Sequence, residues 1–149
     1  MCKSYLDSKL GLIEISGNDM IERVELVSSK DDSFLENEVT IDCKKQLLEY
    51  FSKQREIFDI NINFIGTKFQ KQVWNALLSV PFGKTVSYLD IANMIDTKGV
   101  QAVGSAVGKN PILIICPCHR IINHNGNIGG FSSGLDKKIK LMEIENIVL

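Results

Sequence analysis

The spacing of apolar positions predicts strands first and a helix after them in the N-terminal half of the chain. Apolar residues dominate 10–16 and alternate with polar ones over 21–27, which predicts two strands of a hairpin around a turn at 17–19. Apolar residues at helical spacing then predict a helix near residues 40–54. Residues 59–64 alternate again, which indicates a further strand or an extended linker.

From residue 67 onward, the pattern predicts a series of short helices. Thr67 is suited to cap the first one, and Ser87 to cap a second over 88–95. A third helix is expected over 100–108 and an amphipathic one over 136–146. Two short helices joined by a tight turn with glycine are typical of a helix-turn-helix. The helix over 100–108 contains mainly Ala, Gly, Ser and Val, which suits either tight helix packing or the close approach of a bulky partner.

An apolar run over 112–116 leads directly into Pro117, Cys118, His119 and Arg120. The run predicts a strand that ends at Pro117, because proline cannot donate to a sheet ladder. We therefore expect the thiol of Cys118 at a turn. The neighbouring imidazole and guanidinium should lower the pKa of this thiol and increase its reactivity.

Three interpretations of the cysteines in this segment compete. Cysteine and histidine are ligands of zinc, but a fourth ligand such as Cys43 or His124 would have to come from a distance. Cys116 lies inside the apolar run and suits a buried structural role. Cys118 suits a catalytic thiolate. A cysteine hydrolase normally recruits its histidine from far away in the sequence, so the adjacent His119 argues against that class.

Composition and charge bound the remaining possibilities. A chain of 149 residues with 44% apolar residues can form one domain or two small ones around packed cores. Four unevenly spaced cysteines do not suggest a disulfide framework, and we expect no signal peptide and no membrane span, hence an intracellular protein. Residues 1–65 carry a net charge of −5 and residues 66–149 carry +4, which suggests an anionic partner for the second half.

Over residues 64–149 the chain resembles the O6-alkylguanine-DNA alkyltransferases, also called methylated-DNA–protein-cysteine methyltransferases. The matching blocks occur in order at the family's spacing: Gly66-Thr67-x-Phe69-Gln70-x-x-Val73-Trp74, Pro81-Phe82-Gly83-Lys84-Thr85-Val86-Ser87-Tyr88, Ala102-Val103-Gly104-x-Ala106, Asn110-Pro111, Pro117-Cys118-His119-Arg120-Ile121-Ile122, Gly130-Phe131-Ser132-x-Gly134-Leu135 and Leu141-Met142-x-x-Glu145. The resemblance implies an α+β fold with a small N-terminal α/β domain of ribonuclease-H-like type over 1–64. A winged-helix-like domain with a helix-turn-helix would follow over 65–149.

The resemblance also implies an activity. Such a protein binds double-stranded DNA in the minor groove, flips an O6-alkylguanine into a pocket and transfers the alkyl group irreversibly to Cys118. O4-alkylthymine is a further possible substrate. Each molecule reacts once and needs neither a cofactor nor a metal. We expect a monomer in the cytoplasm, or in the nucleus if the source is eukaryotic.

The resemblance assigns roles to individual residues. His119 would take the thiol proton through a water, Glu145 would orient His119, and Asn110 would brace the turn that holds Cys118. The hydroxyl of Tyr88 would assist the departing guanine. The expected catalytic residues are Cys118, His119, Glu145, Tyr88 and Asn110. The expected substrate-binding residues are Tyr88, Cys118, Ile121, Phe131 and Ser132, with backbone carbonyls of Cys118 and Ile121 accepting from guanine and the backbone N–H of Ser132 facing O6. The expected DNA-binding residues are Gln101, Ala102, Ser105 and Arg120, although Arg120 could instead pin the reactive loop.

Three positions depart from the family pattern. Gln101 replaces the usual arginine that fills the base stack, which predicts weaker DNA binding or slower base flipping. Phe131 replaces a common tyrosine, and Asn146 replaces a usual glycine. Gln101 also motivates an alternative of another class, namely a DNA-binding lesion sensor that transfers no alkyl group.

Overall fold

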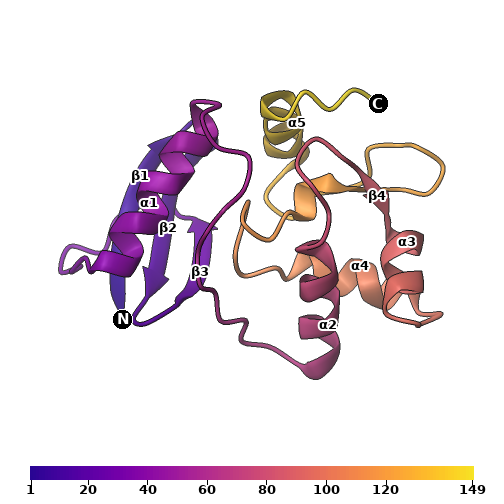
Figure 1. Cartoon of the computed structure of the whole chain (residues 1–149), viewed down its shortest axis with the longest axis horizontal. Helices are drawn as coiled ribbons and strands as arrows, with labels where there is room; N and C mark the ends of the chain where they lie inside the picture. Colours follow the sequence, from indigo (N-terminus) through magenta and orange to yellow (C-terminus); the bar gives the residue numbers. More distant parts are fainter. The chain divides into compact units, whose positions relative to one another are not determined.

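Helices and small sheets are both present in the structure, a computed structural model that describes all 149 residues (Figure 1). This mixture agrees with the expected α+β class. Contacts between residues group the chain into two units, Met1–Phe64 and Ile65–Leu149. None of the helices combines the length and the apolar character that a membrane span requires.

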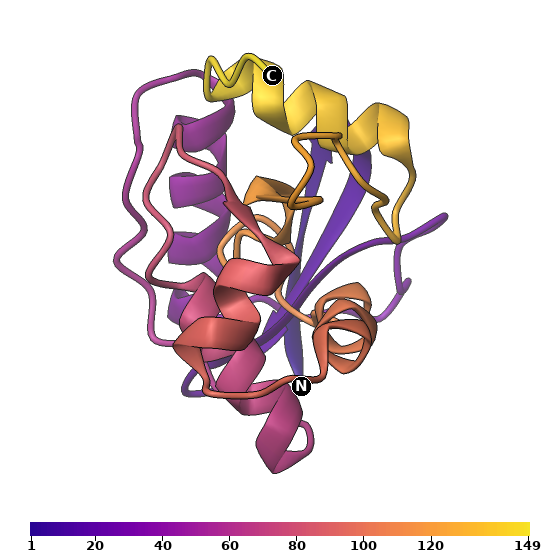
Figure 2. The same ribbon diagram turned by 90° about the vertical axis from the view of Figure 1, so that its right-hand side faces the viewer.

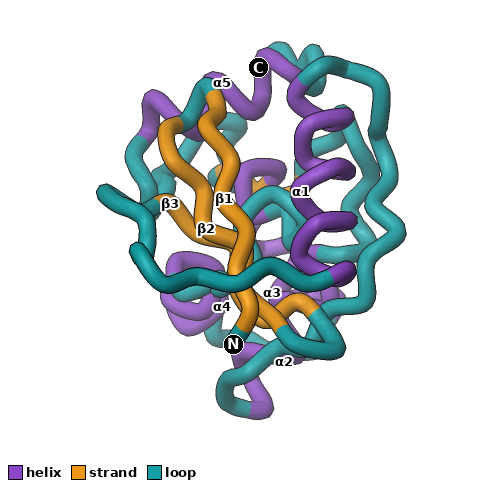
Figure 3. The backbone as a smooth tube through the Cα atoms, turned by 90° about the vertical axis from the view of Figure 1, so that its left-hand side faces the viewer, coloured by secondary structure: helices purple, strands orange, loops and turns teal.

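The first unit is a three-stranded antiparallel sheet with one helix against it (Figure 3). Its strands, in spatial order, are β1 (Cys2–Ser8), β2 (Gly11–Gly17) and β3 (Ile21–Leu26), and the helix is α1 (Glu38–Phe51). The predicted hairpin and helix are thereby confirmed as β2, β3 and α1. Residues 59–64 form no regular strand, and Ile62 makes only an isolated bridge to Ile21.

Burial on both faces of β2 explains why this strand does not alternate cleanly in sequence. Ile13 and Ile15 are fully buried, and the opposite face holds Glu14 and Ser16, which are also buried. Glu14 is tolerated there because the hydroxyl of Tyr5 donates a 2.7 Å hydrogen bond to its carboxylate. The central strand β2 is therefore buried on both faces, whereas Arg23 of β3, which pairs with Ser16, is exposed.

The second unit contains the predicted series of helices (Figure 2). These are α2 (Lys68–Leu77), α3 (Tyr88–Met94) and α4 (Val100–Gly108), and α4 packs against both α2 and α3. Thr67 and Ser87 are confirmed as N-caps, each with a capping box. The indole N–H of Trp74 on α2 donates a 2.9 Å hydrogen bond to the carbonyl of Ala106, which ties α2 to α4.

The apolar run over 112–116 is not a strand, so this prediction is wrong. Ile114 has a φ of +71°, and backbone hydrogen bonds from Ile115 to Leu113 and from Cys116 to Ile112 close tight turns. All five residues are buried. Their apolar character therefore reflects burial of a wound segment in the core, and the left-handed backbone at a β-branched residue carries strain.

The Cys118 turn is held beside the start of α3 by a short parallel pairing. Strand β4 (Val86–Ser87) runs directly into α3 and pairs with β5 (Ile121–Ile122). The single 3-10 turn η1 (Cys118–Arg120) runs directly into β5. Pairing of two short strands thus brings the reactive turn next to the first residue of α3.

The last helix, α5 (Leu135–Ile144), ends in a cap that explains Asn146. Asn146 has a φ of +56°, and its N–H donates to Glu143 while the N–H of Ile147 donates to Met142. This pattern is a Schellman cap, in which glycine is usual and asparagine is tolerated. The cap fixes Glu145, which lies at the helix end rather than within the helix.

We predict that Asn146→Gly leaves stability nearly unchanged, whereas Asn146→Val lowers the free energy of unfolding by about 1 to 2 kcal/mol. Valine is strained in the left-handed conformation, and glycine is not. Urea unfolding at pH 7 measures both variants, with Asn146→Gly as the matched control. Equal losses in the two variants would contradict the left-handed cap.

Candidate active site

Cys118 lies in the wall of a cavity of about 230 Å³ in the second unit. The side chain is buried, but the cavity reaches it. The residues that line the cavity are Tyr88, Gly104, Val107, Gly108, Cys118, Gly130, Phe131 and Ser132. Four of the five expected substrate-binding residues are thus brought together. The fifth, Ile121, is fully buried and does not line the cavity.

Small residues of α4 make room for this cavity. A Cβ atom on Gly104 would lie 3.8 Å from the ring of Tyr88, so the tyrosine packs directly against the helix backbone. Gly108 lines the cavity one turn further along. The other side of α4 exposes Gln101, Ala102 and Ser105, three of the four expected DNA-binding residues. The small residues of α4 therefore allow Tyr88 to pack closely on one side of the helix. On the other side they leave the helix backbone accessible.

The expected lowering of the Cys118 pKa is wrong. Burial raises the pKa of this thiol to about 11, although the hydrogen bond from Asn110 and the positive charge of Lys138 oppose the rise. The neighbouring imidazole and guanidinium do not help, because both are bound to Glu145. The resting thiol is therefore protonated at neutral pH and requires a base before it can act as a nucleophile.

Asn110 holds the reactive turn through three hydrogen bonds. Its amide nitrogen donates to the carbonyl of Cys116 at 2.8 Å and to the sulfur of Cys118 at 3.2 Å. Its amide oxygen accepts from the N–H of Ile112 at 3.0 Å. The side chain thus spans the wound segment before Pro117 and fixes the position of the sulfur.

The carboxylate of Glu145 is the centre of a buried hydrogen-bond network. It accepts from the ring of His119, from the guanidinium of Arg120 at 2.8 and 3.2 Å, and from the N–H of Gly83 at 3.0 Å. Burial would raise the pKa of Glu145, but the bonds from His119, Arg120 and Gly83 lower it to about 2. Glu145 is therefore an anion at any physiological pH.

This anion fixes the protonation of His119. Burial lowers the pKa of His119, with Arg120 and Lys138 acting in the same direction and Glu145 opposing them. The neutral ring carries one proton, and this proton lies on Nε2 because a carboxylate can only accept. Nδ1 is then an unprotonated nitrogen, and it is buried without a hydrogen-bond partner. It can accept a proton.

The position of Arg120 corrects the expectation of a DNA contact. Besides its bonds to Glu145, its guanidinium donates to the carbonyl of Val80 at 2.7 Å and lies 5.8 Å from the centre of the Phe82 ring. The side chain is buried. Arg120 pins the loop before β4 to the end of α5, and it does not share the exposed face of α4.

Lys138 is a site residue that the sequence analysis missed. Its side chain is fully buried, and its ammonium donates to the carbonyls of Ile121, Ile128 and Gly130. A signal was available, because Lys138 lies on the same face of α5 as the buried Leu141 and Met142, and Glu145 follows at helical spacing, seven residues after Lys138. Charged residues on the apolar face of a helix indicate partners inside the protein.

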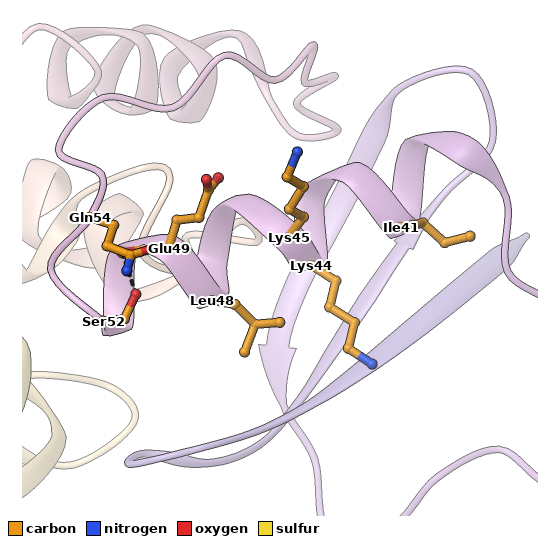
Figure 4. Close-up of a pocket in the computed structure, with 7 residues that line it drawn as sticks. All are labelled: Ile41, Lys44, Lys45, Leu48, Glu49, Ser52 and Gln54. Atoms are coloured by element: carbon orange, nitrogen blue, oxygen red, sulfur yellow. Dashed lines mark hydrogen bonds between the residues drawn. The ribbon is translucent and has the colours of Figure 1, made fainter.

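A second hollow lies along α1 in the first unit (Figure 4). The residues that line it are Ile41, Lys44, Lys45, Leu48, Glu49, Ser52 and Gln54. No cysteine or histidine lines it. No group of three or more His, Cys, Asp or Glu side chains is placed to hold a metal ion anywhere in the structure.

The fold and the site together define a helix-turn-helix protein with a buried cysteine in a cavity beside the second helix. Residues 68–147 match the family profile described as 6-O-methylguanine DNA methyltransferase, DNA binding domain. The chain is 39% identical to a methylated-DNA–protein-cysteine methyltransferase of Methanosarcina acetivorans, across 97% of this chain and 98% of the relative. It is 36% identical to the protein of the same name from Mycobacterium leprae, across 97% and 91%.

A solved structure is similar over nearly the whole chain. Mycobacterium tuberculosis OGT in complex with DNA matches with a TM-score of 0.88 at 33% identity, over 97% of this chain and 92% of that one. This similarity confirms the α+β fold. The chain belongs to the methylated-DNA–protein-cysteine methyltransferase family.

We predict that Glu145→Gln lowers the free energy of unfolding by about 3 to 5 kcal/mol at pH 7, because it leaves a buried guanidinium without its anion. Urea unfolding measures the loss, with the exposed Glu143→Gln on the same helix as control. The carboxylate's contribution is complete above its ordinary pKa of 4.5 and disappears as the pH falls toward about 2. The difference between the wild type and Glu145→Gln should therefore shrink over that range, and a constant difference would contradict the network.

Proposed function

We propose that this protein repairs DNA by moving the alkyl group of an O6-alkylguanine, with O4-alkylthymine as a second candidate substrate, irreversibly to Cys118. Residues 65–149 carry both the DNA-binding and the alkyl-acceptor function in this proposal. The observation that carries it is the position of the Cys118 sulfur in the wall of a cavity beside a helix-turn-helix. A base buried inside a duplex can reach such a sulfur only when it is flipped out of the stack.

Activation of the thiol is assigned to His119 and Glu145. A thiol with a pKa of about 11 needs a base, and the unpartnered Nδ1 of His119 is a nitrogen that can accept a proton. One bridging water would complete the path from the sulfur to Nδ1. Glu145 would stabilise the imidazolium that forms, since it remains a carboxylate hydrogen-bonded to Nε2.

The transfer step is a single in-line displacement. The thiol proton passes to His119, the sulfur bonds to the alkyl carbon, and the bond from that carbon to O6 breaks with its electron pair moving to the guanine. Tyr88 lines the cavity, and its hydroxyl would assist the guanine as it leaves. Ser132 would offer its backbone N–H to O6. The proton on His119 finally neutralises the guanine, so the products are a thioether at Cys118 and an unmodified base.

The carbonyls expected to read the guanine amine already have intramolecular partners. The carbonyl of Ile121 accepts from Lys138 at 2.7 Å, and that of Cys118 accepts from the N–H of Ile121. A carbonyl oxygen has two lone pairs, so each could accept a second bond from the base. In this proposal the two carbonyls accept hydrogen bonds from the guanine amine. Phe131 forms an apolar part of the cavity wall and lacks the hydroxyl that a tyrosine would have.

The exposed face of α4 is the proposed DNA-binding surface. Gln101 is the one larger side chain on this face, and Ala102 and Ser105 are small. The helix backbone can therefore approach a groove closely. Lys98 and Lys109, at the two ends of α4, are exposed and could neutralise phosphates. The mycobacterial OGT structure in complex with DNA supports DNA as the partner, and we propose that this DNA is double-stranded. Action in the cytoplasm, or in the nucleus of a eukaryote, follows from this role.

Reaction with a duplex that contains O6-methylguanine should add one methyl group to the peptide that contains Cys118, as detected by mass spectrometry. Cys118→Ala should abolish transfer and still bind the duplex, because the thiol is not part of the exposed face of α4. Cys116→Ala, which removes a neighbouring buried thiol, is the matched control and should retain transfer.

Methyl transfer to Cys118→Ala, or a methyl group on Cys116, would refute the assignment of the acceptor. Tight binding of the damaged duplex without modification of any thiol would favour the lesion sensor. Several turnovers per molecule would contradict a consumed acceptor.

We predict that Gln101→Arg binds the damaged duplex about five- to tenfold more tightly or reacts correspondingly faster, because a charged donor replaces a neutral one. Fluorescence anisotropy and single-turnover transfer measure the two quantities. Gln54→Arg adds the same charge in the first unit and serves as the control. If Gln101→Arg changes neither quantity, position 101 does not fill the stack in this protein.

A further inference from the structure

Lys138 joins three separate points of the segment that follows the reactive turn. Its Nζ lies 2.7 Å from the carbonyl of Ile121, 2.5 Å from that of Ile128 and 3.0 Å from that of Gly130. These carbonyls belong to the start, the later part and the end of residues 121–130, which comprise β5 and the loop that follows it. One side chain therefore closes this loop from within.

The geometry specifies a charged side chain. An ammonium group has three N–H donors, and three carbonyls accept from Lys138, whereas a neutral amine has only two donors and would leave its lone pair facing an acceptor. The side chain is fully buried, and no carboxylate is bonded to it. Carbonyl dipoles alone hold this cation, which is unusual for a fully buried lysine.

The closed loop forms part of the cavity wall. Gly130 accepts from Lys138 and lines the cavity, and Phe131 and Ser132 follow it directly and line the cavity as well. A Cβ atom on Gly129 would lie 3.6 Å from both Nζ of Lys138 and the ring of Tyr88. Gly129 thus lies close to both the ammonium of Lys138 and the ring of Tyr88, which lines the cavity.

The ammonium also acts on the groups of the reactive turn. Its positive charge lowers the pKa of Cys118 and contributes to lowering that of His119. The titratable groups that face it are Cys118 and His119 on the turn and Tyr88 at the start of α3. Among the charges near Cys118, Lys138 is the one that favours the thiolate.

We infer that Lys138 is a positioning residue for alkyl transfer: it clamps the segment over 121–130 into the cavity wall and places a positive charge where the Cys118 thiolate forms. This inference rests on the proposed function. The contacts of the clamp lie behind the cavity and not on the exposed face of α4, the proposed DNA-binding surface. Lys138 therefore affects the transfer step rather than the affinity for DNA.

Methyl transfer to Cys118 at saturating duplex, measured in single turnover at pH 7, tests the inference. Lys138→Met keeps the length and removes the charge and the donors. We expect its transfer rate to fall by about tenfold to a hundredfold, while its affinity for an unmodified duplex changes by less than about twofold. Lys138→Arg keeps the charge and should recover part of the rate. Lys140→Met, an exposed position on the same helix, should match the wild type.

The pH profile of the wild type provides a test that needs no variant. Burial lowers the pKa of Lys138 to about 8, with Cys118 opposing the shift, so the clamp loses its charge as the pH rises through this value. The transfer rate at saturating duplex should fall between pH 7 and 9.5. Lys138→Arg, which stays charged, should not show this fall.

The outcomes separate the two claims. A wild-type protein that methylates no thiol would refute the proposed function. A wild-type protein that methylates Cys118, with a folded Lys138→Met variant that reacts equally fast, would refute only the role of Lys138. If Lys138→Met does not fold, a wild-type rate that stays level or rises up to pH 9.5 would refute it instead. A loss of DNA affinity as large as the loss of rate would also contradict a role in the transfer step.

Discussion

The buried carboxylate of Glu145 is the constraint on which the rest of the site depends. It accepts from an imidazole and a guanidinium of the reactive turn and from a backbone N–H of the loop at Gly83, and it stays ionised because all three donate to it. A buried charge of this kind is stable only when fully paired, so the end of α5, the loop at Gly83 and the reactive turn must come together. Asn146, in its left-handed cap, is the local device that ends α5 at this point.

Burial raises the pKa of Cys118 and lowers that of His119, and both shifts suit the proposed reaction. It keeps the Cys118 thiol protonated and therefore inert toward small reagents in solution. It also keeps His119 neutral and able to accept a proton. A nucleophile that is generated only beside its base, in a cavity that a flipped nucleotide must enter, is suited to an acceptor that can be used once. Asn110 and Lys138 then determine where the sulfur and the cavity wall lie.

Much of this arrangement could be predicted from the sequence, and the failures have physical causes. The helices of the second unit were predictable because caps and apolar spacing agree at Thr67 and Ser87. Strand β1 was missed because buried polar residues such as Ser4 interrupt its apolar pattern. The run over 112–116 was wrongly predicted to be a strand. Its apolar residues indicate that the segment is buried, but they do not determine the backbone conformation. The thiol pKa was misjudged since adjacency in sequence does not reveal that His119 and Arg120 both turn toward Glu145.

The protonation state of the His119 ring tests this account most directly. Nitrogen-15 chemical shifts of the labelled, unreacted protein near pH 7 distinguish a protonated ring nitrogen from a bare one. The account predicts a protonated Nε2, held by Glu145, and a bare Nδ1 that is able to accept the thiol proton. A proton on Nδ1, either in the other tautomer or in an imidazolium, would leave the buried thiol without a base and would contradict the account.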